Sequence, residues 1–258
     1  LAAAGHEVVL ASDFRAYEGG GDTEAQARIA AEGRAEARRL IALWRGSPKR
    51  PDLWLSYHVY HKSPDYLGPA VSRALGIPYV IAEPSVALKR AKGPFAAPYA
   101  AAASAMAAAD LLLCMTGLDM AGVAEATDRG RIVHLPPFLD TAPFSTCPRA
   151  RRKGPPRLLC VAMMRPGDKL ASYRRLGQAL ALVGSGFELE VVGGGEARID
   201  VEKALAPVQA PVRYLGQVRE DELPAIYAGA DIYVWPAAGE AYGMALLEAQ
   251  ASELPVVA

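Results

Sequence analysis

Short apolar runs alternate with helical segments along most of this chain, and that alternation limits the possible folds more than any other feature. The runs that predict strands lie at 52–57, 76–82, 111–115, 132–136, 157–162, 187–192, 212–218 and 232–235. Helices are predicted at 22–45, 69–75, 96–109 and 222–228. Alternation at this spacing favours parallel, doubly wound sheets, in which ligands bind at the carboxyl ends of strands. The loops that follow strands are therefore the first candidates for a site.

Composition excludes several classes of function. The 258 residues include 28 basic and 28 acidic side chains, so the net charge of zero gives no electrostatic case for a nucleic-acid partner. The sequence contains no run of about 18 apolar residues, the length that would span a membrane. The three cysteines, Cys114, Cys147 and Cys160, have neither metal-ligand spacing nor a disulfide pattern. Cysteines without a disulfide pattern are typical of a reducing compartment, so we expect a cytoplasmic protein.

A segment rich in proline and arginine, 148–156, predicts the boundary between two domains. Its basic residues have no acidic neighbours, and its prolines and glycine discourage regular structure. We expect a first domain over 1–147, a linker over 148–156 and a second domain over 157–258. The arginines of the helix at 22–45 and of the linker suit either a solvated surface or contact with anionic lipid. We favour the solvated surface.

The segment 239–251 carries the strongest chemical signal. It follows the apolar run 232–235 and predicts a glycine-containing loop that bends at Gly243 into a helix. The start of a helix has unpaired N–H groups and a positive dipole end, which suit a phosphate or diphosphate. Glu240 precedes that start and Glu248 lies about two turns inside it. Two carboxylates cannot both serve a phosphate, but they can accept hydrogen bonds from the hydroxyls of a sugar and a ribose. The alternative is a pair of solvated glutamates around an ordinary helix.

The run from Glu240 to Ala249, followed by Pro255-Val256-Val257-Ala258, resembles the Glu-x7-Glu signature of retaining glycosyltransferases of the GT-B fold, most closely family four. The resemblance implies two Rossmann-like, doubly wound parallel-sheet domains that face a cleft. Residues 1–10 predict the end of a helix, a turn and a buried strand. In that family a further strand and a loop come before these elements. Further helices follow the segment that closes the chain. We therefore expect a fragment that lacks both termini, with both domains incomplete.

The resemblance also implies a reaction. A sugar would pass, with retention at its anomeric carbon, from a UDP- or GDP-sugar to the hydroxyl of a carbohydrate, lipid-linked or small-molecule acceptor, as in polysaccharide biosynthesis. No two Asp residues stand two apart, so the sequence has no Asp-x-Asp motif and we expect no metal. No cofactor is expected beyond the donor itself. A lipid-linked acceptor would allow peripheral contact with the inner membrane face.

The family pattern assigns roles in the second domain. Glu240 would hold the hydroxyls of the donor sugar and orient its ring, and Glu248 would accept from the ribose. Lys169 would bind the leaving diphosphate together with Arg165, two cations that we place in one loop after the strand 157–162. The rival interpretation is a surface loop paired with Asp168. The rest of the predicted donor site is Ala241, Tyr242, Gly243 and Met244.

The other candidates lie in loops after strands. Gly193, Gly195 and Val218 are predicted on the nucleobase side, with the glycines serving a close backbone approach to a ligand or a tight turn. The family often has a histidine where this chain has Glu83-Pro84, so His58, Lys62 and Glu83 are the candidates for that contact with the donor sugar or the acceptor. Ordinary polar loop residues are an equal alternative. His58 and His61 lack a convincing third ligand for a metal.

Three other functions compete with the transferase. The first is a non-catalytic domain of the GT-B fold that binds a nucleotide or sugar. The second is another GT-B enzyme, such as a sugar epimerase or a phosphorylase, although no carboxylate arrangement typical of one is visible. The third is a nicotinamide-dependent enzyme, which is disfavoured because Arg198 stands where the glycine fingerprint requires its last glycine.

Overall fold

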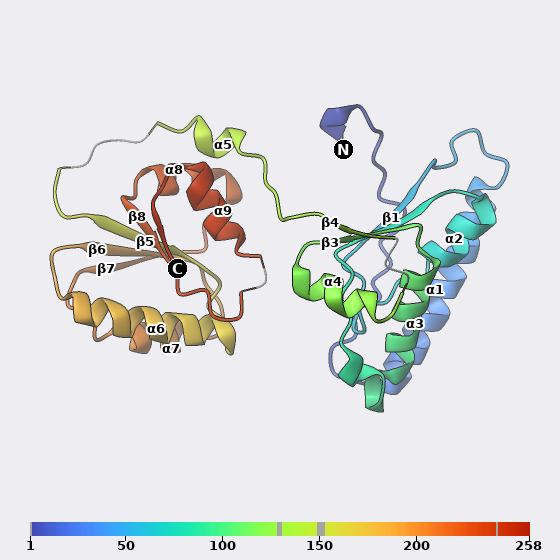
Figure 1. Ribbon diagram of the computed structural model, residues 1–258, viewed down its shortest axis with the longest axis horizontal. Coiled ribbons are helices and arrows are strands. Elements are labelled where there is room, and N and C mark those ends of the chain that lie inside the picture. Colours follow the sequence, from blue (N-terminus) through green and yellow to red (C-terminus); the bar gives the residue numbers. More distant parts are fainter. Residues whose placement is uncertain (1, 128–130, 149–152, 241) are drawn as a thin grey trace. The chain divides into compact units, whose positions relative to one another are not determined.

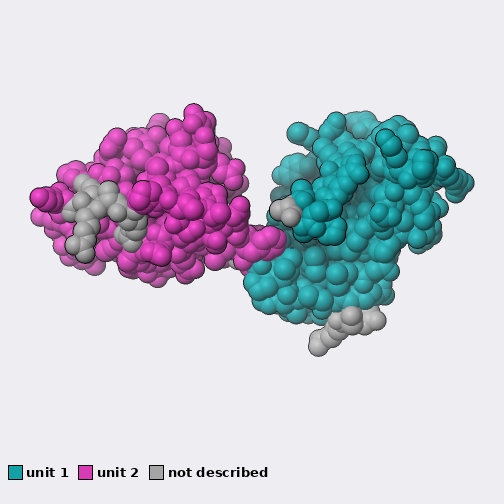
Figure 2. All heavy atoms as spheres, turned by 90° about the horizontal axis from the view of Figure 1, so that it is seen from above, with its two compact units in different colours: residues 1–136 teal, residues 137–258 magenta. Residues whose placement is uncertain are grey.

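The chain folds into two compact units in the computed structural model, residues 1–136 and residues 137–258, which are coloured separately in Figure 2. The structure describes residues 2–127, 131–148, 153–240 and 242–258. Each unit is built on one sheet, and all neighbouring strands that are described run parallel. The predicted alternation of strands and helices is therefore confirmed in both units.

The sheet of the first unit has the order β1-β2-β3-β4. Its strands are β1 (Trp54–Tyr57), β2 (Tyr79–Ala82), β3 (Leu111–Cys114) and β4 (Ile132–His134). Its α-helices are α1 (Thr23–Trp44), α2 (Gly68–Leu75), α3 (Ala96–Ala108) and α4 (Gly117–Ala124). Short 3-10 turns are η1 (Ala2–Ala4), η2 (Leu88–Arg90) and η3 (Gly93–Phe95). All four residues of β2 are buried, which is why this strand is an unbroken apolar run.

The long first helix forms for local reasons that the sequence shows. The Asp22 side chain accepts from the backbone N–H groups of Glu24 and Ala25 and caps the helix. The buried residues of α1 recur at helical spacing and form one face: Gln26, Gly33, Ala37 and Leu40. The arginines of this helix are exposed, and one of them, Arg39, pairs with Glu36.

The sheet of the second unit has the order β7-β6-β5-β8-β9. Its strands are β5 (Arg157–Val161), β6 (Glu188–Val192), β7 (Val212–Gly216), β8 (Ile232–Val234) and β9 (Val256–Val257). Its helices are α5 (Ala142–Ser145), α6 (Asp168–Val183), α7 (Arg198–Leu205), α8 (Leu223–Ala228) and α9 (Met244–Ala251), with the turn η5 (Glu220–Glu222). Figure 1 shows α6 and α7 on one face of this sheet and α8 and α9 on the other, which is a doubly wound arrangement.

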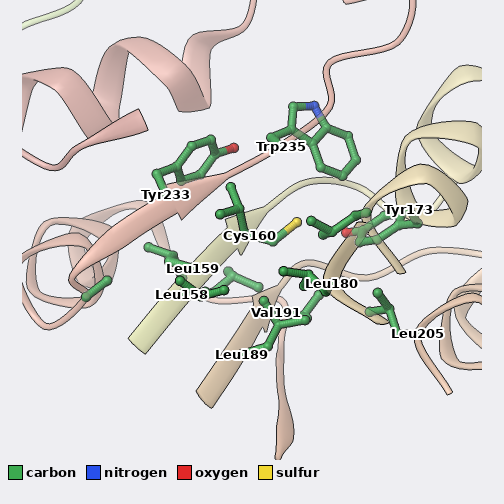
Figure 3. Close-up of a cluster of buried hydrophobic side chains, with 14 of the residues drawn as sticks. Leu158, Leu159, Cys160, Tyr173, Leu180, Leu189, Val191, Leu205, Tyr233 and Trp235 are labelled. Carbon is green, nitrogen blue, oxygen red and sulfur yellow. The ribbon is translucent and has the colours of Figure 1, made fainter. Parts of the chain in front are cut away.

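The core of the second unit lies around the central strands β5 and β6 (Figure 3). Leu159, Cys160 and Leu189 have no exposed surface. Tyr173 from α6 packs edge-on against Trp235, with ring centroids 5.0 Å apart and planes at 75°. Burial of large side chains contributes about 25 cal/mol for each Å² of apolar surface removed from water. This packing fixes Trp235 immediately after β8, where the site begins.

Two sequence expectations differ from the structure. The predicted buried strand over 6–10 is wrong, because these residues form no strand and Val8, Val9 and Leu10 are 60%, 67% and 81% exposed. A strand needs a neighbour to pair its backbone N–H and C=O groups, and none lies beside this segment among the described residues. The helices α6 and α7 were not predicted, although Leu170, Tyr173 and Leu180 of α6 are buried at helical spacing.

The chain passes from the first unit to the second at residues 136–137, ahead of the predicted linker 148–156. Helix α5 belongs with the second unit because it packs on α8 and α9. The Phe144 ring stands edge-on to the Tyr227 ring, with centroids 5.9 Å apart. Residues 149–152 of the predicted linker lie outside the described residues.

Candidate functional site

The candidate site lies at the carboxyl edge of the second sheet, where the strand order reverses. From β5 the chain goes to β6 on one side, and it later returns to β8 on the other side. The loops that follow β5 and β8 leave the sheet in opposite directions, and the crevice between such loops is where open α/β sheets bind ligands. The two segments are tied together here, because Ala238 N–H donates to the Ser172 hydroxyl at 3.0 Å.

Lys169, Trp235 and Glu240 meet at this switch point. Lys169 lies in the first turn of α6, and its Nζ is 2.5 Å from Oε2 of Glu240. The indole Nε1–H of Trp235 donates to the same oxygen at 3.2 Å. The Lys169 ammonium also lies 5.5 Å from the centre of a Trp235 ring, within the range of a cation–π contact. Trp235 is 2% exposed, so a rigid aromatic side chain orients both members of the ion pair.

The surroundings of Glu240 favour its charged form. Burial alone would raise the pKa of this carboxyl group, because it removes the charge from water. The hydrogen bonds from Lys169 and Trp235, the Lys169 charge and a backbone hydrogen bond from Gly243 outweigh that effect, and the pKa of Glu240 is lowered. Glu240 is therefore a carboxylate at neutral pH, and a carboxylate accepts hydrogen bonds from hydroxyl groups.

Glu248, the second acid of the motif, has the opposite electrostatics. Its Oε2 accepts from the Tyr227 hydroxyl at 2.7 Å, and Tyr227 is completely buried. Burial raises the pKa of Glu248, and the charge of Glu220 adds to the rise, while the Tyr227 hydrogen bond opposes it. The motif thus places one carboxyl group with a lowered pKa before α9 and one with a raised pKa inside it.

The turn between Glu240 and α9 requires glycine. Gly243 has φ +65° in the left-handed region, and α9 begins at the next residue, Met244. A Cβ atom at Gly243 would lie 2.7 Å from Cδ1 of Leu246, and one at Gly239 would lie 2.6 Å from Oδ2 of Asp168. The first N–H groups of a helix have no partner within it, so this turn presents donors at the site. Tyr242 is half-buried and Met244 is exposed, while Ala241 lies outside the described residues.

The two predicted cations do not share one loop. Lys169 belongs to helix α6 and binds Glu240, whereas Arg165 lies in the loop before that helix. Arg165 is exposed and forms no ion pair with a described residue. The expectation of one shared loop is wrong, because Pro166-Gly167 predicts a continuing loop but Gly167 directly precedes the first residue of α6. Among the described residues, Asp168 forms no ion pair with either cation.

The predicted nucleobase-side glycines approach the chain's own backbone. Gly193 and Gly195 have φ of +130° and +147°. A Cβ atom on them would collide with the carbonyl oxygens of Ala162 and Met164. The β6 loop is thereby held against the β5 loop, and Met164 N–H donates to Gly194 O at 2.8 Å. Val218 follows β7 and is partly buried against the same core. The glycines and Val218 therefore lie after strands at the edge that holds Glu240, and their contact with a base stays a prediction.

His58 and Glu83 come together at the carboxyl edge of the first sheet. They follow the neighbouring strands β1 and β2, and Nδ1 of His58 is 2.7 Å from Oε1 of Glu83. Both residues have a positive φ, +57° and +58°, which is strained for residues with a Cβ atom. Glu83 is buried, and its hydrogen bond with the Tyr57 hydroxyl raises the pKa of Tyr57 to about 12. Lys62 lies in the loop after β1, where its carbonyl oxygen accepts from Glu18 N–H.

Sequence reasoning missed Trp235 and Tyr227. Trp235 had a usable signal, because it is an aromatic donor directly after a strand and five residues before Glu240. Tyr227 had none, since it is 21 residues from Glu248 and only the packing of α8 against α9 joins them.

Among the described residues, no group of three His, Cys, Asp or Glu side chains is placed to hold a metal ion. Within the same residues, every helix is too short or too polar to cross a membrane.

Parts of this chain are similar in sequence to known glycosyltransferases. Residues 155–258 match the family described as "Glycosyl transferases group 1". The chain is 39% identical over 67 residues to the sulfoquinovosyl transferase SQD2 of Arabidopsis thaliana, a match that covers 26% of this chain and 13% of that protein. It is 34% identical over 149 residues to a GDP-mannose-dependent alpha-(1-6)-phosphatidylinositol monomannoside mannosyltransferase of Mycobacterium tuberculosis, covering 48% of this chain and 37% of that protein. The chain thus spans well under half the length of these relatives.

Solved structures show the same fold at low sequence identity. The lipopolysaccharide outer core galactosyltransferase WaaB is 17% identical, with a TM-score of 0.60 over 90% of this chain and 62% of its own. Anabaena Alr3699/HepE in complex with UDP-glucose is 15% identical, with a TM-score of 0.62 over 86% of this chain and 62% of its own. The expected fold class is confirmed, because the two parallel sheets resemble those of GT-B glycosyltransferases. The chain is therefore similar to glycosyltransferases in fold, and its second unit is similar to the group 1 glycosyl transferases in sequence.

Proposed function

We propose that this chain carries the donor site of a retaining glycosyltransferase. It would transfer a sugar from a nucleotide-diphosphate donor to an acceptor hydroxyl. The observation that carries the proposal is the Lys169–Glu240–Trp235 arrangement at the switch point of the second sheet. All three residues fall within the segment that matches the glycosyl transferase family. A stabilised carboxylate, a cation and the start of a helix are what a sugar diphosphate requires from its site.

Each group has a defined task in the proposed reaction. Glu240 accepts hydrogen bonds from the donor-sugar hydroxyls and orients the ring. Lys169 has three N–H donors, so it can hold Glu240 and a phosphate oxygen at the same time. Arg165 and the first turn of α9 add positive charge beside the leaving diphosphate. Glu248 accepts from the ribose hydroxyls. The bond from the anomeric carbon to the diphosphate breaks, the acceptor oxygen bonds to that carbon, and the acceptor proton passes to the diphosphate.

The relatives indicate the class of donor. The mannosyltransferase of M. tuberculosis is named for its dependence on GDP-mannose, and the HepE complex contains UDP-glucose. We propose a UDP- or GDP-sugar as donor and a carbohydrate or lipid-linked hydroxyl as acceptor, with no metal and no protein nucleophile in the reaction. We also propose that the protein acts in the cytoplasm, with peripheral contact to the inner membrane face if the acceptor is lipid-linked.

A thermal-shift panel with UDP, GDP, ADP and NAD tests the proposed function. A ligand at about 100 times its dissociation constant stabilises a folded protein by about 2.7 kcal/mol. We expect one nucleoside diphosphate to raise the unfolding temperature of the chain, and Lys169→Gln to remove most of that shift. The matched control is Lys203→Gln, which removes the same charge from an exposed pair on α7. A shift with NAD alone, or with no nucleotide, would count against a nucleotide-sugar site.

The strongest alternative is a non-catalytic domain that binds the nucleotide or sugar without turnover. A thermal shift does not separate the two functions, but release of nucleoside diphosphate from UDP- or GDP-sugars in the presence of an acceptor mixture does. Release that depends on Glu240 supports the transferase. Conversion of the donor sugar without a new glycosidic bond would instead favour another GT-B enzyme, such as an epimerase.

A further inference from the structure

A group of basic side chains lies in the first unit, outside the site described above. His61 and Lys62 follow β1, and Lys89 and Arg90 belong to η2 in the loop after β2. We call these four residues the basic cluster. None of them forms an ion pair with an acidic residue in the part of the chain that the structure describes. Among the described residues, the cations of the cluster are therefore not paired directly with an acidic side chain.

Phe95 holds two members of the cluster together. Its ring is 5% exposed and stands edge-on to the His61 ring, with centroids 5.3 Å apart and planes at 90°. The guanidinium carbon of Arg90 lies 5.2 Å from the centre of the same ring. Nε2 of His61 and Nε of Arg90 are both buried and have no hydrogen-bond partner. Buried polar groups without partners are rare and costly, so a ligand group that reached these two nitrogens would satisfy them.

The charges of the cluster act on one another. Burial lowers the pKa of His61, and the charges of Arg90, Lys62 and Lys89 lower it further, in that order. The three cations are thus close enough to His61 to disfavour its protonated form. An anion placed among them would offset this repulsion and make the protonated imidazole a further donor.

The acid that lines a small pocket with His61 and Lys62 is already engaged. Glu18 accepts from the backbone N–H groups of Gly20 and Gly21 and from the Gln26 amide, at 2.6 to 3.0 Å. These neutral donors lower the pKa of Glu18 and keep it charged, so Glu18 brings one negative charge beside His61 and Lys62, and the four basic residues still outnumber it.

From this geometry we propose that the basic cluster binds a phosphate group that the acceptor carries. Three cationic side chains and an imidazole suit the several oxygens of a phosphate, and their loops follow strands at the edge where parallel sheets bind ligands. The inference rests on the proposed function, because it names the class of acceptor for that transferase. The phosphate belongs either to a lipid headgroup or to a soluble sugar phosphate, and the test separates these two sources.

The test follows the ring signals of the four histidines by NMR while inorganic phosphate is added to the full chain. UDP or GDP is kept at saturation, so that the diphosphate site of the second unit is occupied. His61→Gln assigns the relevant signal. We expect phosphate to shift the His61 signals and raise the pKa of His61. The double variant Lys62→Gln/Arg90→Gln should weaken phosphate binding at least about tenfold, since each charge-assisted hydrogen bond contributes at least about that factor.

The control variant is Arg73→Gln, which removes one exposed charge from α2 in the same unit. It should leave phosphate binding unchanged. A thermal unfolding curve for each variant shows whether it is folded. If the His61 signals do not move with phosphate, or if the double variant and Arg73→Gln respond like the parent chain, the basic cluster is not an anion site.

Two further additions identify the carrier of the phosphate. A response of His61 to glucose 6-phosphate supports a soluble acceptor. A response to vesicles of phosphatidylglycerol in phosphatidylcholine, without a response to pure phosphatidylcholine, supports a lipid headgroup. A response to inorganic phosphate but to neither carrier overturns the acceptor assignment. If phosphate leaves the His61 signals unchanged while a nucleotide still raises the unfolding temperature, only this inference is wrong. If no nucleotide raises the unfolding temperature, the proposed function itself is wrong.

Discussion

Glu240 and Glu248 belong to one motif, yet the protein treats their carboxyl groups in opposite ways. Lys169 and Trp235 hold the pKa of Glu240 below its ordinary value despite burial, whereas burial raises the pKa of Glu248. A group with a lowered pKa contributes stability above its unfolded value of 4.5, and that stability is lost as the pH falls through the folded pKa. A carboxyl group with a raised pKa does the reverse, because its charged form costs stability above the folded pKa and that cost disappears on acidification.

The two glutamates therefore predict opposite results for the same substitution. Glu240→Gln should lower the free energy of unfolding at pH 7 by about 1 kcal/mol, a value reduced by partial exposure of the pair, and the loss should fade as the pH falls from 4.5 through the lowered pKa of folded Glu240. Glu248→Gln should leave the free energy of unfolding at pH 7 unchanged or raise it, because an uncharged amide still accepts from Tyr227. Urea unfolding at pH 7 and at about pH 3 measures both. Equal losses at pH 7 would mean that Glu240 is not paired as described.

At the scale of elements, the loop after β6 is held by glycines whose roles differ. Gly193 has φ +130°, and a Cβ atom there would collide with the Ala162 carbonyl oxygen, which belongs to the backbone and cannot move aside. Gly194 has ordinary φ, and its added Cβ atom would lie 3.1 Å from Cγ of the Gln217 side chain, which can rotate away. Gly193→Ala should therefore destabilise the chain by about 2 to 4 kcal/mol and Gly194→Ala by less than about 1 kcal/mol. Urea unfolding of the two variants decides between these roles, and equal costs would contradict them.

The elements also show how far the sequence alone could lead. The strands were predictable because parallel strands buried on both faces leave unbroken apolar runs, as at Leu158–Cys160 in β5. Glu240 and Glu248 were predictable because their motif is local. The partners of these acids on other helices, Lys169 on α6 and Tyr227 on α8, were not predictable as partners. Lys169 lies 71 residues from Glu240, and Tyr227 lies 21 residues from Glu248. Contacts between distant segments follow from packing, which a local pattern does not contain.

At the scale of the whole molecule, the two units have separate cores. The buried cluster around β5 and β6 shares no residue with the one around β2 and β3. Each unit has a parallel sheet and an apolar interior of its own, so each is expected to open as its own cooperative unit in native-state hydrogen exchange. A ligand raises the opening free energy only of the unit that binds it. The amides that become protected on binding therefore show which unit holds the donor site.

Hydrogen exchange with and without the nucleoside diphosphate found in the thermal-shift panel tests that pattern. At about 100 times its dissociation constant, the ligand adds about 2.7 kcal/mol to the opening free energy of the unit that binds it. The slowest amides of β5 and β6 should then exchange about 100-fold more slowly. The amides of β2 and β3 should keep their rates, because no residue of the proposed diphosphate site lies in the first unit. Equal slowing in both sheets would show that the units open together, and slowing confined to β2 and β3 would place the nucleotide in the first unit.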